Sequence, residues 1–135
     1  MNTLTQEDER QIHALLLRYA TAIDTRDWPL LKSCFTASVK ADYGDFGSWH
    51  SADEIATVMR ELHKDMGLTL HRISNIVITS GQGSVTARSY VDAMLTGKTP
   101  QEGCQQGIGF YDDEFVKSEQ GWKIQQRKFT LVQML

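Results

Sequence analysis

The hydrophobic pattern of this chain changes its period once, near Gly67. Before that point apolar residues recur every three or four positions, as they do on one face of a helix. After it, four long segments alternate apolar and polar residues, at 68–79, 84–95, 107–118 and 122–134. Because successive side chains of a strand point to opposite faces, the sequence predicts helices first and a four-stranded antiparallel meander afterwards.

Three helices are predicted before the meander. The first begins at Thr5, which with Asp8 resembles a capping box, and its apolar positions 12, 15, 16, 19 and 23 form one stripe. Asp27 is the predicted cap of a short second helix. Ser51 opens a third helix, whose apolar side runs to residue 66 and which Gly67 closes.

A short strand around Val39 is expected to join the meander at an edge. The long strands require a sheet that twists and curls, and Gly107 and Gly109 permit a bulge or a close approach. Helices packed on a strongly curved antiparallel sheet form a cone that encloses a pocket. We therefore predict one α+β domain over residues 1–135.

The composition argues against several classes of function. With 23% charged residues and a net charge of -3, the chain lacks the clustered Lys and Arg that nucleic-acid binding needs. No apolar run approaches the roughly 20 residues of a membrane span, and no signal peptide is predicted. We therefore expect a cytoplasmic protein that binds neither nucleic acid nor a membrane. Cys34 and Cys104 show no metal-ligand spacing, and one His with one Asp lacks a third ligand, so no metal site is predicted.

Asp24 lies at the margin of the first helix's apolar stripe, where it is either a helix-end acid or an acid that faces a cavity. His71 lies in the first long strand, with Ile73 and Val77 on its predicted face. A lone histidine there is more often a core residue that bonds to the backbone. If the first helix crosses the sheet, Asp24 would accept a hydrogen bond from one ring nitrogen and raise the basicity of the other. Asp27 is the better cap, which leaves Asp24 for this role.

Two further residues have both a structural and a functional interpretation. Tyr19, one turn before Asp24, is either a core aromatic or a phenol that donates to an oxyanion. Arg127 is predicted to share a face with Phe129 rather than with Lys128, either ion-paired or as a fixed cation near an anionic group. The positions of the remaining histidines predict exposure: His13, His50 and His63.

Residues 15–44, 71–78 and 109–127 resemble the SnoaL-like branch of the NTF2-like superfamily, which includes scytalone dehydratase, lindane dehydrochlorinase and bile-acid 7α-dehydratase. The resemblance covers nearly the whole chain. It implies a cystatin-like cone, and its pattern of a tyrosine, an aspartate, a strand histidine and a last-strand arginine falls on Tyr19, Asp24, His71 and Arg127. Such enzymes use the His-Asp pair as a base that removes a proton from carbon while a hydroxyl or chloride leaves.

The resemblance therefore implies a cofactor-independent lyase of the dehydratase type, or an isomerase. The expected substrate is a small apolar cyclic molecule, resembling a steroid, a polyketide or a halogenated ring. The alternative is a non-catalytic ligand-binding or enzyme-partner module, like the small subunits of ring-hydroxylating dioxygenases. A homo-oligomer is expected, with a trimer favoured over a dimer. The residues expected to line the pocket are Tyr43, Met59, Met94, Phe110 and Phe129; Asp92 is a further polar candidate whose register against Met94 is open.

Overall fold

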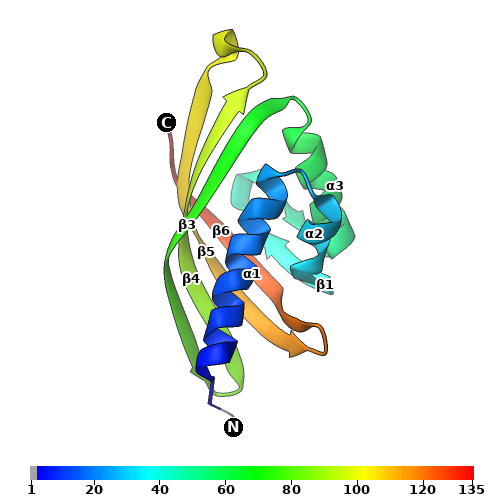
Figure 1. The fold of residues 1–135 in the computed structure, drawn as a ribbon, viewed down its shortest axis with the longest axis vertical. Helices are drawn as coiled ribbons and strands as arrows, with labels where there is room; N and C mark the ends of the chain where they lie inside the picture. Colours follow the sequence, from blue (N-terminus) through cyan, green and yellow to red (C-terminus); the bar gives the residue numbers. More distant parts are fainter. Residues whose placement is uncertain (1–2) are drawn as a thin grey trace.

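A computed structural model describes residues 3–135 (Figure 1). The helices are α1 (Gln6–Asp24), α2 (Trp28–Ser33) and α3 (Ala52–His63). The strands are β1 (Phe35–Asp42), β2 (Ser48–Trp49), β3 (Met66–Gly81), β4 (Ser84–Gly97), β5 (Cys104–Ser118) and β6 (Gly121–Met134). Two short 3-10 helices, η1 (Gly44–Phe46) and η2 (Pro100–Glu102), lie in connections. The change from helices to long strands after residue 65 agrees with the change of period in the sequence.

The strands form one sheet in the order β2-β1-β6-β5-β4-β3. Strands β3 to β6 pair antiparallel as successive hairpins, which confirms the predicted meander. β1 joins the edge of the meander beside β6, as predicted, but it runs parallel to β6, a direction that its hydrophobic pattern does not specify. The sheet stays open, with β2 and β3 as its two edges.

Gly109 marks a bulge in the curved part of the sheet. The register of β5 against β6 shifts between Ile108 and Gly109. A Cβ atom at Gly109 would lie 2.3 Å from the backbone carbonyl oxygen of Thr130 and 2.8 Å from the ring of Phe129. Only glycine allows the two strands to approach this closely, so Gly109 has both the bulge and the close approach that the sequence permits.

A second irregularity lies at Asn75 in β3, which has a positive φ of 50°. The register of β3 against β4 shifts between Ser74 and Val77. An extra residue in one strand reverses the faces of the side chains that follow it. As a result Val77 is exposed on the outer face, and the prediction that it shares the face of His71 is wrong.

Helix α1 packs across the inner face of the sheet, while α2 and α3 pack against each other beside β1 (Figure 1). The five predicted apolar positions of α1 are all buried. The capping box at its start is confirmed: the Thr5 hydroxyl accepts from the Asp8 N–H at 3.0 Å, and the Asp8 carboxylate accepts from the Thr5 N–H at 3.1 Å. The buried stripe fixes α1 across the strands, so its last turn lies over the start of β3.

The third helix ends earlier than the sequence predicts. It stops at His63, and Met66 and Gly67 already belong to β3. A Cβ atom at Gly67 would lie 2.3 Å from the backbone oxygen of Gly97. Gly67 is therefore a point of close approach between β3 and β4 and not the end of a helix. Glycine is common both at helix ends and where strands approach closely, so its presence alone did not distinguish the two.

Candidate active site

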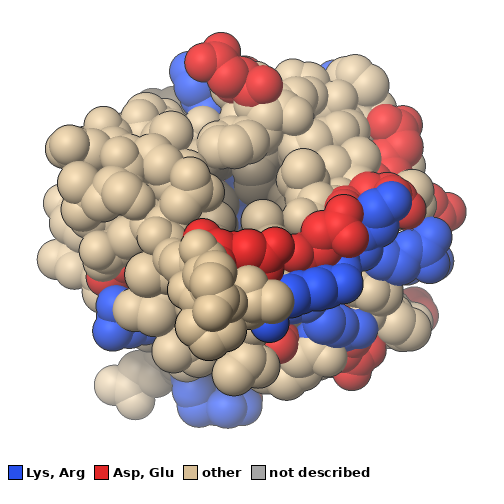
Figure 2. Space-filling model, turned by 90° about the horizontal axis from the view of Figure 1, so that it is seen from above, with Lys and Arg blue, Asp and Glu red and all other residues tan. Residues whose placement is uncertain are grey.

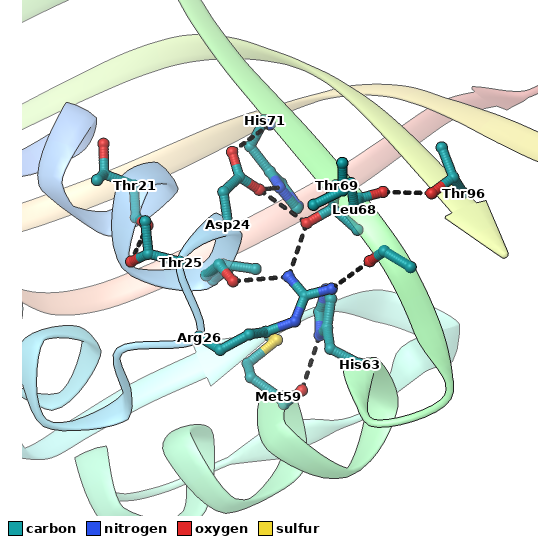
Figure 3. A network of polar contacts seen from close by, with 12 residues as sticks. Thr21, Asp24, Thr25, Arg26, Met59, His63, Leu68, Thr69, His71 and Thr96 are labelled. Atoms are coloured by element: carbon teal, nitrogen blue, oxygen red, sulfur yellow. Dashed lines mark hydrogen bonds and ion pairs between the residues drawn. The ribbon is translucent and has the colours of Figure 1, made fainter. Parts of the chain in front are cut away.

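The carboxylate of Asp24, the last residue of α1, points toward the start of β3 (Figure 3). Its Oδ2 accepts a hydrogen bond from the His71 backbone N–H at 2.8 Å. Its Oδ1 lies 2.7 Å from Nδ1 of His71 and accepts a hydrogen bond from the Thr69 hydroxyl at 2.9 Å. Asp27 is the residue that caps α2, because its carboxylate accepts from the Leu30 N–H at 3.0 Å. Asp24 thus binds Thr69 and His71, and Asp27 caps the helix.

The hydrogen bonds of Asp24 determine the tautomer of His71. Burial raises the pKa of Asp24, but the hydrogen bonds from the His71 ring, the His71 backbone and Thr69 outweigh it, and the net pKa lies below the ordinary value. A carboxylate only accepts, so Nδ1 of His71 carries a proton, and in the neutral ring Nε2 holds the lone pair. The side chains of His71 and Asp24 are 9% and 17% exposed. Within residues 3–135, Nε2 has no hydrogen-bond partner, which leaves it available as a base.

Arg26 holds the other side of this network, a role that nothing in the sequence pattern suggests. It has a positive φ of 58°, just after the end of α1. Its guanidinium donates to the carbonyl of Ile23 at 2.8 Å, to the Thr69 hydroxyl at 2.8 Å and to the carbonyl of Gly67 at 2.6 Å. From the sequence, an arginine in a polar turn is normally expected to have an exposed side chain. Here it joins the end of α1 to the start of β3 and so fixes Asp24 relative to His71 (Figure 3).

His71 lies in the wall of a cavity of about 160 Å³ between the helices and the inner face of the sheet. Tyr19, Tyr43, Met59 and Phe129 line it with His71, and most of the remaining wall is apolar. In Figure 2 the end of the molecule is hollowed, with uncharged side chains to the left and right of the hollow and acidic side chains along its lower edge. The imidazole of His71 therefore faces an apolar space, where a small molecule would be shielded from water.

A second hollow, of about 610 Å³, lies over the outer face of the sheet. Its wall includes many charged side chains, and Arg88 pairs with Asp112 at 2.8 Å across β4 and β5. Asp112 is opposite Lys128 in the register of β5 and β6. Such a row of exposed charged side chains is a solvated sheet face, and it contains neither Asp24 nor His71. We therefore place the candidate site in the smaller, apolar cavity.

Two phenols meet beside this cavity. The hydroxyls of Tyr19 and Tyr43 lie 2.8 Å apart, and both side chains are buried. The guanidinium of Arg127 donates to the Tyr43 hydroxyl at 3.3 Å. Burial raises the pKa of Tyr19 well above its ordinary value, so this phenol stays protonated. The pair of hydroxyls is thus a source of hydrogen-bond donors close to an apolar wall.

Arg127 does not line the cavity, although it lies on the inner face with Phe129, as the alternation predicts. Its Nε and Nη2 donate to Asp113 at 2.7 and 3.0 Å, and neither side chain of this pair is exposed. Its guanidinium lies 4.2 Å from the ring centre of Tyr19 and 3.7 Å from that of Tyr111. Burial lowers the pKa of Arg127, but the charge of Asp113 outweighs it and keeps the guanidinium charged. Arg127 therefore contacts the cavity wall from behind, through its hydrogen bond to Tyr43 and its contacts with the rings of Tyr19 and Tyr111.

Met94 and Phe110 are not pocket residues, contrary to the prediction. The inward side chains of β4 and β5 fall on odd positions, such as Ala93 and Tyr111, which line the cavity. Met94 and Phe110 therefore face the outer side of the sheet, where the guanidinium of Arg88 lies 4.2 Å from the ring centre of Phe110. Both are apolar residues, and an apolar residue type alone does not indicate which face of the sheet the side chain is on.

Asp92 faces the same outer side. Its carboxylate accepts from Arg72 at 3.1 Å and from the side chain of Gln106 at 2.8 Å. The structure fixes the register that the sequence leaves open, because Asp92 and Met94 lie on one face of β4, away from the cavity. Asp92 is therefore not a candidate for the chemistry of the site.

His63 is predicted to be exposed, but it is buried at the end of α3, with only 6% of its surface exposed. It lines the cavity, and its ring centre lies 6.1 Å from that of His71. The sequence does contain a signal for this position, because His63 follows Ile55 and Met59 at steps of four residues and so continues their buried stripe. The prediction missed this signal because a histidine at the end of a helix is usually solvated.

Residues 3–135 contain neither a cluster of metal-binding side chains nor a helix that could span a membrane. No group of three or more His, Cys, Asp or Glu side chains in this part of the chain has an arrangement that would hold a metal ion. None of the described helices is long and apolar enough to cross a membrane.

Comparison with solved structures gives similar folds at low sequence identity. A protein from Novosphingobium aromaticivorans that is provisionally named a scytalone dehydratase is 20% identical, with a TM-score of 0.86 over 95% of this chain and 86% of the other. A second protein from that organism, provisionally named an aromatic ring hydroxylase, is 24% identical, with a TM-score of 0.86 over 97% and 93% of the two chains. A hexachlorocyclohexane dehydrochlorinase, LinA type 2, is 13% identical, with a TM-score of 0.80 over 97% and 92%.

These likenesses establish a cystatin-like fold. No curated protein matches the chain significantly. The family model described as a SnoaL-like domain matches residues 5–128, which is nearly the whole sequence. The chain therefore belongs to the SnoaL-like family.

Proposed function

We propose that this protein is a cofactor-independent lyase of the dehydratase type, or an isomerase, that acts on a small apolar cyclic molecule. The observation that carries the proposal is the Asp24–His71 pair: a carboxylate orients one ring nitrogen at 2.7 Å, and the other ring nitrogen faces an apolar cavity. Oriented imidazoles of this kind are the usual general bases of enzymes near neutral pH. The family and its structural neighbours support an elimination or isomerisation on this fold.

In the proposed reaction Nε2 of His71 removes a proton from a carbon next to a carbonyl group. The electron pair of the broken C–H bond then forms a carbon–carbon double bond. In an elimination, a halide on the neighbouring carbon leaves with its bonding pair, or a hydroxyl there leaves as water after it takes the proton from the imidazolium; in an isomerisation, the imidazolium returns the proton to another carbon. Asp24 stabilises the imidazolium, because the opposite charge of the carboxylate lies within hydrogen-bond distance.

The phenol pair supplies the second element of the proposed mechanism. If the Tyr43 hydroxyl accepts from both Arg127 and Tyr19, its own proton is free to point into the cavity. A donor placed there stabilises the negative charge that develops on the substrate carbonyl oxygen. In this arrangement Tyr43 donates directly, and Tyr19 and Arg127 are positioning residues that act through it. The cation of Arg127 makes the Tyr43 hydroxyl a stronger donor.

The alternative is a non-catalytic ligand-binding or partner module, of the type of the dioxygenase small subunits. The likeness to the protein named an aromatic ring hydroxylase is the observation that favours it. A module that works through its sheet surface needs no oriented base beside a cavity. The three hydrogen bonds of Asp24 to Thr69 and His71 are therefore better explained by catalysis.

A substrate screen followed by two variants tests the proposal. Hydroxylated and halogenated cyclic ketones and steroids are screened for turnover by a change in absorbance. On a verified substrate, His71→Ala and Asp24→Asn are each expected to lower kcat by about 10²- to 10⁴-fold, because each removes part of the general base. Circular dichroism checks that both variants are folded.

The matched control is His13→Ala, which changes an exposed histidine on α1 and is expected to leave kcat unchanged. Unchanged kcat in folded His71→Ala would reject the assignment of His71 as the base. Binding of a ring compound without turnover of any screened compound would favour the binding module.

A further inference from the structure

The cavity contains a second imidazole besides the proposed base. His63 ends α3, and the centre of its ring lies 6.3 Å from that of Trp28 and 6.1 Å from that of His71. The side chain is more than nine-tenths buried and forms part of the cavity wall. The reaction proposed above uses only His71, so the position of this second buried histidine needs a separate explanation.

The hydrogen bond of His63 determines which of its nitrogens is free. Nδ1 lies 2.7 Å from the backbone oxygen of Met59 (Figure 3). A carbonyl oxygen cannot donate, so Nδ1 carries the proton and Nε2 holds a lone pair. Among residues 3–135 no group bonds to this Nε2. The cavity therefore contains an oriented acceptor that the protein itself leaves unused.

The surroundings keep His63 neutral and distinguish it from His71. Burial is the largest influence and lowers the pKa of His63, and the charge of Arg26 and the neighbouring His71 act in the same direction. The bond to Met59 and the charge of Asp24 oppose this, but the net pKa stays below its ordinary value. Asp24 hydrogen bonds directly to His71 and not to His63. Two imidazoles in one cavity thus have different surroundings, because only the His71 ring is hydrogen-bonded to a carboxylate.

The dimensions of the cavity limit what can approach both imidazoles. An apolar protein cavity of about 150 Å³ holds one benzene molecule, and this cavity measures about 160 Å³. The enclosed space therefore accepts about one six-membered ring. The half-exposed side chains of Phe46 and Leu62 stand at its mouth, where further apolar parts of a larger molecule would lie.

We propose that His63 determines substrate specificity: its Nε2 accepts a hydrogen bond from a hydroxyl group on the substrate ring while that ring fills the cavity beside His71. This inference rests on the proposed function and names the substrate class more closely, as a single apolar ring that carries a hydroxyl group. A buried acceptor disfavours a ring without a donor, because the acceptor then stays unpaired. His63 thus selects and orients the ring, and His71 removes the proton.

Phenol and toluene are suitable probes because they differ in the hydroxyl group and have nearly the same size. Binding of each is measured by titration calorimetry at pH 7.5 on the wild-type protein and on His63→Phe. The ratio of the phenol affinity to the toluene affinity is expected to fall by about tenfold in His63→Phe, the effect of one hydrogen bond. The control His13→Phe, on the exposed side of α1, is expected to keep the wild-type ratio.

Nitrogen-15 NMR of the wild-type protein gives a test that needs no variant. The spectrum is expected to show His63 with a protonated Nδ1, and its Nε2 resonance is expected to move upfield with phenol and not with toluene. An unmoved Nε2 resonance of His63 at saturating phenol would overturn the proposal, as would an unchanged affinity ratio in folded His63→Phe. These are binding measurements, so the proposed function, tested by turnover in His71→Ala, can fail or stand independently.

The variant His71→Ala also shows which imidazole the phenol hydroxyl contacts. If it keeps the wild-type ratio of affinities, the hydroxyl bonds to His63, as proposed. If the ratio falls in His71→Ala and not in His63→Phe, the hydroxyl bonds to the base, and the role assigned to His63 is wrong.

Discussion

Asp24 orients His71 through two different atoms, and this double contact is stricter than a single ring hydrogen bond. The backbone N–H of His71 binds Oδ2, and the ring Nδ1 lies against Oδ1. The carboxylate therefore fixes the position of the strand and the orientation of the ring at once. Thr69 completes the arrangement, because its hydroxyl accepts from Arg26 and donates to Asp24. A rotation of the imidazole would break the ring contact without replacing it.

The stability of the protein should depend on pH through Asp24. The pKa of this carboxyl is lowered from its ordinary value of 3.8, so the folded state binds its proton less readily than the unfolded state. The stabilisation is fully present above pH 3.8 and is lost as the pH falls through the lower, folded-state value. At pH 7, Asp24→Asn is expected to lower the free energy of unfolding by about 1–3 kcal/mol, through lost charged hydrogen bonds.

Urea unfolding of the wild type and Asp24→Asn, at pH 7 and at pH 3, measures this effect. The difference between the two proteins should shrink at pH 3, because there the Asp24 carboxyl of the unfolded wild type binds a proton more readily than that of the folded protein, while the asparagine does not titrate. A difference that stays constant over this range would show that the charge of Asp24 contributes nothing to stability.

At the scale of the elements, the bulge at Gly109 connects the curvature of the sheet to the cavity. Gly109→Ala is expected to lower the free energy of unfolding by about 1–3 kcal/mol, the usual cost of overpacking. The reason is that a new Cβ would lie 2.3 Å from the carbonyl oxygen of Thr130, and backbone cannot move away as a side chain can. Phe129, a cavity residue, would also be displaced.

Gly81→Ala is the matched control for this change. No heavy atom lies within 4 Å of a Cβ placed at Gly81, and its φ is not positive, so the variant should be as stable as the wild type or slightly more stable. Urea unfolding compares the two variants. Equal stability of Gly109→Ala and Gly81→Ala would show that β5 and β6 can separate at the bulge without cost.

The elements were predictable where a periodic pattern ran without interruption. The long strands β4, β5 and β6 and the buried stripe of α1 follow directly from their periods. The pattern fails at irregular residues, since a period says nothing about an inserted residue. Asn75 reverses the faces in β3, and Gly67 serves a close contact between strands instead of a helix end.

The site was predictable only in part, for a similar reason. Asp24 and His71 have signals of their own, an acid at the margin of an apolar stripe and a histidine in an apolar strand. Arg26 has none, because its contacts with Thr69 and Gly67 exist only once α1 and β3 are packed together. Arg127 has a pattern that gives its face but not its partner Asp113 on the neighbouring strand.

On the scale of the whole molecule, the two faces of the sheet differ in what covers them. The helices cover the inner face, whereas no described element covers the outer face (Figure 1). Leu70, Tyr90 and Val132 on that outer face are each about half exposed or more, next to the half-buried Met94 and Phe110. Strand order places these residues on one face of the sheet across β3 to β6, with the Arg72–Asp92 ion pair among them. A patch of this kind is a common protein interface.

We propose that the protein associates through this outer face and, as the family resemblance implies, forms a trimer. Tyr90→Glu is expected to shift the wild-type trimer to monomer in sedimentation velocity, because it would bury three carboxylates near the threefold axis or at three equivalent interfaces. Leu17→Glu is the matched control, since Leu17 is as exposed as Tyr90 but lies on α1. It should leave the trimer intact.

A monomeric wild type at working concentrations would reject the proposal, and a trimer that survives Tyr90→Glu would place the interface elsewhere. Asp24, His71 and the cavity lie on the other side of the sheet. Dissociation of the trimer by Tyr90→Glu should therefore leave the affinity for phenol unchanged.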